Sequence, residues 1–382
     1  MEERSVPEWV YRLRRDYRAM LPAASLVARV RNEADAGGGG GCVISPERQE
    51  LIYNEVVRDA VCVRFPPSFA FRKRFLKALL DVIQEQDEEV FEPLLETYME
   101  LLQAREEREA CYKTYSFMVG DEEKTITIKI AQEFHVVGLA EWEAGFYLAE
   151  FILTHPEMFR DKVCLELGSG IGLTGLVLGA VGPKQVVFTD YLEDPVLANL
   201  RLNVQNSGFA VSPLRQDDTR ERTEASAQQR PPEMNVEQLD WQDFSEEQLA
   251  VYRPDYIIAA DVLYDPGLVD ACLKVVSQVL ERNPACVALI ASTIRNENTF
   301  AHFLAQAPAM GLAVTTAQLH ASPPALVDTL PFSLPPPSAL FTAAADAPPS
   351  PQLQLPRLFP YVRENKTIII NAIRRRERSE QQ

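Results

Sequence analysis

The apolar positions of the first hundred residues recur with helical spacing. In residues 1–35 most of them fall three or four positions apart, which is typical of the buried stripe of an amphipathic helix. These positions are Trp9, Val10, Leu13, Tyr17 and Leu21. The same spacing predicts three further helices, at 47–58, 71–82 and 90–104. Pro66 and Pro67 favour an extended or turn conformation for the stretch VCVRFPPSF. We therefore expect residues 1–112 to form a helical module.

Beyond residue 110 the pattern changes to strands. Residues 111–117 and 125–130 alternate between polar and apolar positions around the turn sequence VGDEEK, which predicts a β-hairpin. Short apolar runs and helical segments then follow one another, which is typical of strands joined by helices. Seven strands are expected, at 163–167, 185–190, 235–241, 255–263, 286–292, 312–319 and 366–373. The helices are expected at 141–153, 173–181, 194–206, 267–281 and 296–306.

This order of elements predicts an α/β fold. Strands that alternate with helices form a parallel sheet with helices on both faces, while the last two strands, with no helix between them, predict an antiparallel pair. We expect a seven-stranded Rossmann-like sheet over residues 113–373, with ligand binding at the carboxyl ends of its strands.

Three stretches do not fit this pattern. Residues 321–357 are so rich in Pro and Ala that we expect a disordered insertion between the last two strands. The polar stretch 206–232 predicts a loop, and Gly37–Gly41 predicts a flexible linker. Residues 374–382 form a charged tail.

Composition narrows the class of protein. The chain has 382 residues, of which 46% are hydrophobic, enough for a sizeable core. Its formal net charge of −17 argues against broad binding to nucleic acid or to an anionic membrane. No apolar run reaches about 18 residues, and the N-terminus lacks the features of a signal peptide. We expect a cytoplasmic protein. The six cysteines are scattered without ligand spacing, so no metal site is expected.

The stretch Val163–Gly175, VCLELGSGIGLTG, carries the strongest chemical signal. It predicts a buried strand, a glycine turn and the start of a helix, an arrangement that brings backbone N–H groups to a nucleotide. Gly170, Gly172 and Gly175 fit the dinucleotide fingerprint GxGxxG. The longer frame of Glu166, Gly168, Gly170 and Gly172 also fits the first motif of S-adenosylmethionine methyltransferases. Asp190 does not separate the two, because both folds use an acid at the end of the second strand to bind a ribose.

Other candidates lie at the ends of later strands. Asp261 and Tyr264, in the sequence ADVLY, would lie near the reactive end of a cofactor, although Asp261 could instead cap the following helix. Asp240 and Trp241 could accept the amino protons of an adenine and stack on its ring, although Trp241 could equally pack on a neighbouring helix. Trp142, at the head of a helix, could close over the cofactor or belong to the core.

Together these residues resemble family 16 of the seven-β-strand methyltransferases. The resemblance rests on Trp142 after the hairpin, ELGSGIGLTG, Asp190, LDW, and DVLY as the [DE]-x-x-[YF] tetrapeptide of that family. The N-terminal stretch VCVRFPPSFAFRKRFLKALL resembles the members that act on translation elongation factor 2. The resemblance implies a lysine methyltransferase whose substrate is a protein, elongation factor 2. We expect a monomer that does not act on nucleic acid.

The resemblance also implies roles for individual residues. The expected S-adenosylmethionine ligands are Trp142, Glu166, Gly168, Ser169, Gly170, Asp190, Asp240, Trp241 and Ala260. Asp261 and Tyr264 would shape the acceptor side, with Asp261 orienting the lysine ammonium before its proton leaves to water. Three alternatives stay open: a methyltransferase of another protein or small molecule, a nicotinamide-dependent enzyme, and a non-catalytic protein that binds S-adenosylmethionine.

Overall fold

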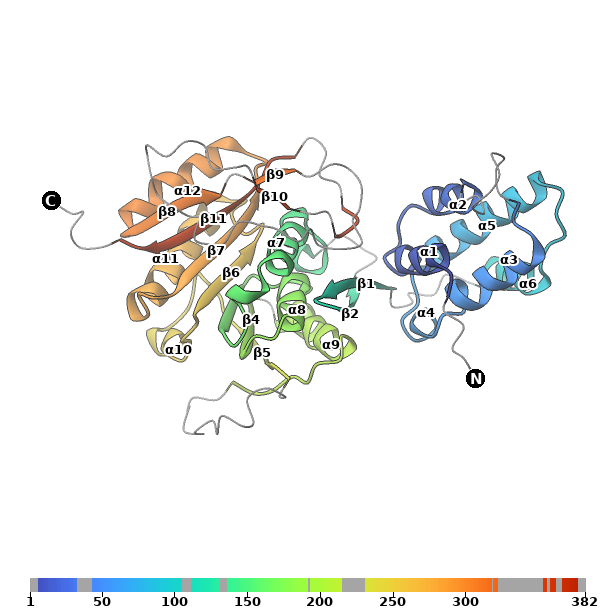
Figure 1. Cartoon of the computed structure of the whole chain (residues 1–382). Coiled ribbons are helices and arrows are strands. Elements are labelled where there is room, and N and C mark those ends of the chain that lie inside the picture. The colour runs from blue at the N-terminus through green and yellow to red at the C-terminus, as the bar shows by residue number, and fades with distance from the viewer. Residues whose placement is uncertain are drawn as a thin grey trace. The chain divides into compact units, whose positions relative to one another are not determined.

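The computed structural model shows two compact units (Figure 1). The described residues are 6–32, 43–104, 111–130, 136–191, 193–214, 231–317, 319–321, 353–355, 358–361 and 366–376. The first unit comprises Met1–Ser116 and Thr127–Glu133, and the second comprises Phe117–Ile126 and Phe134–Gln382. The linker at Gly37–Gly41, residues 215–230 of the predicted loop and the tail beyond Arg376 lie outside the described residues.

The first unit is helical, as its periodicity predicts. Its elements are α1 (Glu8–Arg18), α2 (Ala23–Asn32), α3 (Pro46–Ile52), the π-helix η1 (Tyr53–Val57), α4 (Ala60–Arg64), α5 (Phe69–Glu85) and α6 (Glu92–Gln103). Aromatic rings fill its core: the Tyr17 ring lies 5.1 Å from that of Phe71 and 4.8 Å from that of Phe75. The amphipathic stretch 1–35 is broken into α1 and α2, because Met20 turns into the left-handed region at φ 54°.

One prediction for this unit is wrong in part. VCVR is helical rather than extended, because Asp59 accepts a hydrogen bond from Cys62 N at 3.2 Å and so caps the short helix α4, whereas residues 65–68 are not helical, as predicted. The prolines do separate α4 from α5, which begins after Ser68. Asp59 also accepts two hydrogen bonds from the Arg18 guanidinium, at 2.6 and 2.9 Å, and this buried pair joins α1 to α4.

The second unit is built on a seven-stranded sheet, which confirms the predicted fold class. The strand order is β5-β4-β3-β6-β7-β11-β8. Its strands are β3 (Val163–Leu167), β4 (Gln185–Asp190), β5 (Glu233–Gln238), β6 (Tyr256–Ala260), β7 (Val287–Thr293), β8 (Leu312–Ala317) and β11 (Ile368–Arg375). All neighbours are parallel except β11, which runs antiparallel to β7 and β8.

Helices cover both faces of the sheet (Figure 1). One layer holds α7 (Glu143–Thr154), α8 (Leu173–Ala180) and α9 (Ala198–Asn206). The other holds α10 (Glu246–Ala250), α11 (Pro266–Arg282) and α12 (Glu297–Ala309). The short helices η2 (Val137–Leu139), η3 (Pro156–Met158) and η4 (Glu193–Leu197) occupy the connections. The chain runs outward from β3 in both directions, so its order reverses between β3 and β6, where such sheets bind ligands.

Outside the sheet, β1 (Cys111–Val119) and β2 (Glu122–Ile130) form the predicted hairpin. The stretch expected to be disordered, 321–357, contains one described strand, β10 (Leu353–Leu355), which pairs in parallel with β9 (Leu319–Ala321). Residues 322–352 lie outside the described part of the chain. Just after this stretch, buried Glu150 of α7 accepts hydrogen bonds from the N–H groups of Leu358 and Phe359 at 2.7 and 3.1 Å.

No described helix meets the length and hydropathy that crossing a bilayer requires. The described cysteines Cys62, Cys111, Cys164, Cys272 and Cys286 are buried free thiols. Within the same described ranges, no three His, Cys, Asp or Glu side chains group as metal ligands would.

Replacing Asp59 by Asn is expected to destabilise the first unit by about 2–4 kcal/mol, because the Arg18 charge then loses its buried partner. Burial opposes ionisation of Asp59, but hydrogen bonds and charge from Arg18 outweigh it and hold its pKa below the usual 3.8. The stabilisation is therefore present above about pH 4 and is lost as the pH falls through the folded-state pKa. Urea titrations of the full chain, followed by hydrogen exchange in α1, measure both effects. The exposed pair of Lys77 and Asp81 provides the control, since Asp81→Asn should cost under about 0.5 kcal/mol.

Candidate active site

A cavity of about 630 Å³ lies at the carboxyl ends of β3, β4 and β6. Its walls come from the loop before α7, the glycine turn after β3 and the residues that follow β4, β5 and β6. All eleven residues nominated from the sequence line it: Trp142, Glu166, Gly168, Ser169, Gly170, Asp190, Asp240, Trp241, Ala260, Asp261 and Tyr264. Folding thus brings the candidate residues into one place.

The turn between β3 and α8 needs glycine both for its conformation and for space. Gly168, Gly170 and Gly172 have φ angles of 67°, 54° and 84°, which residues with a Cβ rarely adopt. A Cβ on Gly170 would lie 2.9 Å from the carbonyl oxygen of Gly138, and one on Gly168 would lie 3.2 Å from the Trp241 ring. The glycines therefore let the loop before α7 and the Trp241 indole close on the turn from two sides.

Glu166 brings a buried carboxyl group to this turn, with 4% of the residue exposed. Its Oε1 accepts a hydrogen bond from Gly175 N at 3.1 Å. A Cβ on Gly175 would lie 2.5 Å from Oε2, so glycine at this position makes room for the carboxyl group. Burial raises the pKa of Glu166 to about 8; hydrogen bonds from Ser169 and Gly175 act against this, and the charge of Asp190 adds to it. At neutral pH the group is mostly protonated.

Asp190 ends β4 and fastens the glycine turn to it. Its Oδ2 accepts a hydrogen bond from Gly170 N at 2.9 Å, and its Oδ1 accepts one from Tyr191 N at 2.8 Å. The residue is 7% exposed and lines the cavity. Its position at the end of the second strand of the sheet agrees with the sequence, and its contact with Gly170 adds a role in holding the turn.

Asp240 and Trp241 follow β5, which ends at Gln238 rather than at the predicted residue 241. Asp240 Oδ1 accepts a hydrogen bond from Gln242 N at 2.8 Å. The Trp241 ring packs on the core between the sheet and α11, and it also lines the cavity. Its indole N–H is buried, with no hydrogen-bond partner in the part of the chain that the structure describes. Trp241 therefore packs on the core, as one alternative expected, and its ring also faces the cavity, where stacking on an adenine stays a prediction.

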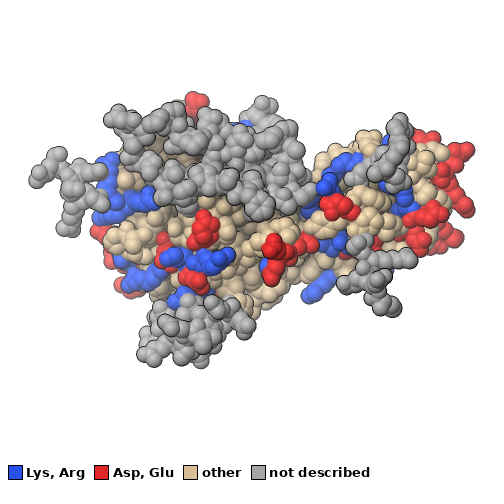
Figure 2. Space-filling model, viewed as in Figure 1, with Lys and Arg blue, Asp and Glu red and all other residues tan. Residues whose placement is uncertain are grey.

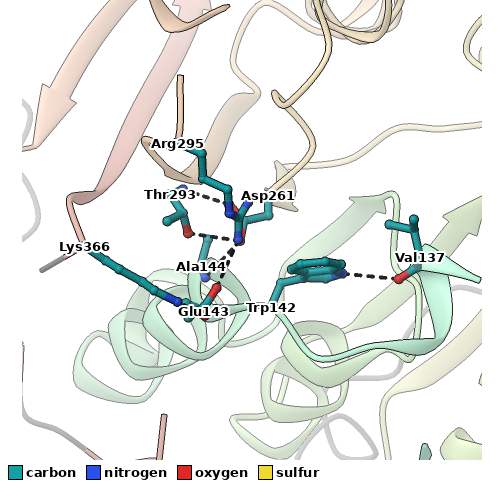
Figure 3. Close-up of polar contacts among 8 residues, drawn as sticks. All are labelled: Val137, Trp142, Glu143, Ala144, Asp261, Thr293, Arg295 and Lys366. Atoms are coloured by element: carbon teal, nitrogen blue, oxygen red, sulfur yellow. Dashed lines mark hydrogen bonds and ion pairs between the residues drawn. The ribbon is translucent and has the colours of Figure 1, made fainter. Parts of the chain in front are cut away.

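Asp261 is the most heavily bonded residue of the site (Figure 3). Its carboxylate accepts hydrogen bonds from Thr293 N at 2.7 Å, Thr293 Oγ1 at 3.0 Å, Ala144 N at 3.3 Å and Arg295 Nη2 at 3.2 Å. A carboxylate offers about four acceptor positions, so these donors leave little capacity for a substrate amine. The side chain is only 4% exposed. This geometry favours a positioning role over the direct contact with an ammonium that we expected.

The alternative that Asp261 caps the helix after it does not hold. Asp265 caps α11 by accepting hydrogen bonds from Gly267 N at 2.9 Å and Leu268 N at 3.2 Å, as its place before Pro266 suggests. Asp261 instead reaches Ala144 in the first turn of α7, an element that precedes it by more than a hundred residues. Its φ of 53° turns the chain sharply at the end of β6.

Three exposed aromatic residues line the cavity, among them Tyr191, which is 60% exposed. Trp142 is 39% exposed and Tyr264 is 53% exposed. The Trp142 indole N–H donates a hydrogen bond to the carbonyl oxygen of Val137 at 3.2 Å, which fixes one edge of the ring (Figure 3). Partial burial, together with nearby Tyr191, Asp190 and Asp265, raises the pKa of the Tyr264 phenol, so the hydroxyl remains protonated at neutral pH.

The cavity is acidic. Five of its lining residues carry carboxyl groups: Glu141, Glu166, Asp190, Asp240 and Asp261. Among the lining residues that the structure describes, none is Lys, Arg or His. A site of this kind suits a ligand with positive charge and disfavours a pyrophosphate, which parallel-sheet proteins bind with backbone N–H groups and cationic side chains.

Arg295 is a site residue that the sequence reasoning missed. It lies between β7 and α12, and its guanidinium contacts Asp261, Glu143 and the face of Trp142. Its position just beyond the carboxyl end of a strand is the signal that could have revealed it, because the same rule selected Asp190 and Asp261. Glu141 and Tyr191, which also line the cavity, were missed as well.

Glu166→Gln is expected to flatten the pH dependence of stability. The folded protein holds the Glu166 proton up to about pH 8, whereas the unfolded chain releases it near 4.5. The natural protein should therefore lose stability as the pH rises from about 4.5 to 8, and the variant, which has no proton to lose, should be more stable at pH 8. Melting temperatures across this range test the prediction. Glu281→Gln, at an exposed position, is the control. Parallel curves of melting temperature against pH for the natural protein and Glu166→Gln would contradict the prediction.

Comparison with known proteins shows what the chain is related to. A family model described as lysine methyltransferase matches residues 121–307. The protein-lysine N-methyltransferase EEF2KMT of Homo sapiens is 30% identical over 283 residues, covering 73% of this chain and 79% of that protein. The Bos taurus protein of the same name is 32% identical over 252 residues, covering 65% and 74%. The protein-lysine N-methyltransferase EFM3 of Chaetomium thermophilum is 27% identical over 289 residues, covering 70% and 80%. The similarity extends over most of both chains, so this protein belongs to the lysine methyltransferase family and is an enzyme.

Proposed function

We propose that this enzyme transfers a methyl group from S-adenosylmethionine to a lysine side chain of translation elongation factor 2, in the cytoplasm. The family supplies the reaction class. The relatives named EEF2KMT and the resemblance of the N-terminal stretch support the substrate.

The charge of the cavity is the observation that carries the choice of cofactor. Both readings of the glycine motif, dinucleotide and S-adenosylmethionine, fit the sequence. The carboxyl groups of Glu141, Asp190 and Asp240, without a cationic side chain among the described lining residues, disfavour the pyrophosphate of a dinucleotide. They suit S-adenosylmethionine, which carries a sulfonium and an ammonium group.

The residues proposed to hold this cofactor are those that the sequence nominated. Asp190 would accept hydrogen bonds from the ribose hydroxyls, and Gly168 and Gly170 would let the backbone approach the methionine and ribose. Asp240 and the Trp241 ring would bind the adenine. Trp142 would cover the methionine end. Glu166, Ser169 and Ala260 complete the proposed set.

Bound S-adenosylmethionine supplies a methyl group that a neutral amine accepts by direct displacement, without an enzyme-bound intermediate. The chain must therefore orient the lysine nitrogen and exclude competing water. The protonated Tyr264 hydroxyl can donate a hydrogen bond to the lysine nitrogen or accept one from it. It does not act as a general base. Asp261 contributes by holding the start of α7, which lines the cavity, against the end of β7.

We also propose that residues 1–112 recognise the protein substrate. In support, the outer face of α6 exposes Leu95, Met99 and Leu102 on one stripe, each more than 40% exposed. Acidic side chains gather where α5 ends and α6 begins (Figure 2), including Glu85, Asp87, Glu89 and Glu92. An apolar stripe beside an acidic surface suits a basic region of a protein partner.

Asp190→Ala is expected to weaken the binding of S-adenosylmethionine about tenfold or more, because hydrogen bonds to a charged group are each worth about 1.5–3 kcal/mol. Calorimetry gives the affinity. The control is Asp255→Ala: this carboxylate also accepts a backbone hydrogen bond, from Val163 N at 2.9 Å, but at the opposite end of β3. Equal affinities for the natural protein and Asp190→Ala would contradict the assignment.

The substrate is tested by incubating purified elongation factor 2 with the enzyme and methyl-labelled S-adenosylmethionine. We expect a single methylated lysine, located by mass spectrometry, and loss of the label with Asp190→Ala. Label in other proteins of a lysate, but none in elongation factor 2, would overturn the proposed substrate and leave the enzyme class standing.

Replacing Leu95, Met99 and Leu102 together by Ser is expected to raise the KM for elongation factor 2 about tenfold while leaving the affinity for S-adenosylmethionine unchanged, because the stripe lies in the first unit. The matched control replaces Leu202 of α9 and Leu304 of α12 by Ser. These residues are 43% and 41% exposed. An unchanged KM in the α6 variant would count against substrate recognition by this face.

A further inference from the structure

We infer that Arg295 is a positioning residue that holds the Trp142 indole in place as a wall of the cavity. Arg295 does not line the cavity, and Trp142 does. The effect on ligand binding rests on the proposed function, because S-adenosylmethionine is the ligand that Trp142 would cover. The effect on the indole itself does not depend on any ligand.

The Arg295 guanidinium contacts three groups at once (Figure 3). It lies over the Trp142 ring, with its central carbon 5.2 Å from the ring centroid, within the range of cation–π attraction. Its Nη2 atom lies 3.2 Å from Asp261 Oδ2 and 3.0 Å from Glu143 Oε2. The guanidinium is therefore fixed by two carboxylates on one side and covers the indole on the other.

Trp142 is held from two directions. Its Nε1–H donates to the carbonyl oxygen of Val137 at 3.2 Å, and Arg295 covers one face of the ring. The backbone of Trp142 precedes the first turn of α7, where Asp261 accepts a hydrogen bond from Ala144 N. With 39% of the residue exposed, packing alone fixes the indole less than it would fix a core side chain. These polar contacts decide its orientation.

Arg295 is itself restrained, which a positioning residue requires. Glu143 pairs with both Arg295 and Lys366, which lies two residues before β11. The charges therefore alternate along Lys366, Glu143, Arg295 and Asp261 (Figure 3). This series of ion pairs links the segment before β11, the start of α7 and the end of β6. The guanidinium pairs with Glu143 and with Asp261, and these two ion pairs restrain it over the indole.

Lysine at this position would keep only part of the arrangement. An ammonium group could still neutralise the buried Asp261 carboxylate, so the fold should survive. It lacks the planar guanidinium that stacks on an aromatic ring. Arg295→Lys therefore separates the role in stability from the role in holding Trp142.

The first test follows the indole without any ligand. The full chain is labelled with 5-fluorotryptophan, and the resonances of Trp9, Trp142 and Trp241 are assigned with single Trp→Phe variants. In Arg295→Lys we expect the Trp142 resonance to broaden and its solvent isotope shift to increase, while Trp9 stays unchanged. The control, Arg375→Lys, replaces an arginine of β11 that pairs with Glu281 of α11. An unchanged Trp142 resonance in Arg295→Lys would overturn the inference.

The second test measures how S-adenosylmethionine affinity depends on both residues. Arg295→Lys and Trp142→Leu are each expected to weaken binding about three- to tenfold by calorimetry, the range that a lost cation–π contact or aromatic wall implies. In the double variant we expect no more than the loss seen with Trp142→Leu alone, because Arg295 acts through the indole.

The outcomes of the two tests separate the proposals. Full additivity in the double variant, or an affinity within twofold of natural for Arg295→Lys, would overturn the claim that Arg295 acts on binding through Trp142. If the natural protein does not bind S-adenosylmethionine, the proposed function fails, while the fluorine spectra still decide whether Arg295 holds the indole.

Discussion

The Asp261 carboxylate is the contact on which the rest of the active site depends. It joins the end of β6 to Thr293 at the end of β7, to the first turn of α7 and to Arg295. Its side chain is nearly inaccessible to water, and a buried charge without partners would be costly. The four donors stabilise the charge and, in doing so, hold the end of β6 and the start of α7, which line the cavity, against the end of β7.

The same site balances its charges in two ways. Arg295 neutralises Asp261 from outside the cavity, whereas Glu166 avoids a charge by staying protonated at neutral pH. Five carboxyl groups can therefore line one cavity without all of them being ionised at once. The remaining negative charge suits a sulfonium cofactor and a lysine substrate, and this links the electrostatics of the fold to the chemistry of the family.

Close packing explains why the glycine motif has its particular spacing. Gly170 admits the carbonyl of Gly138, and Gly168 admits the Trp241 ring. Gly175 leaves room for the Glu166 carboxyl group and the Phe188 ring. The glycines thus serve contacts with the chain itself as well as the approach of a ligand. The glycine motif alone therefore does not distinguish the two cofactors that fit it.

The amino-acid pattern predicted the seven strands, the longer helices between them and eleven of the residues that line the cavity, but not the short helix α10. The hydrophobic period is a local property of the chain and predicts where each strand ends. The carboxyl ends of parallel strands share one edge of the sheet, so residues at those ends come together. The partners of those residues followed from the packing of distant elements. Asp261 accepts a hydrogen bond from Ala144 N in the first turn of α7 and does not cap α11, the helix that follows it, and Arg295 reaches Trp142 and Asp261 across long separations in sequence. Such contacts depend on how distant elements pack, which no local pattern encodes.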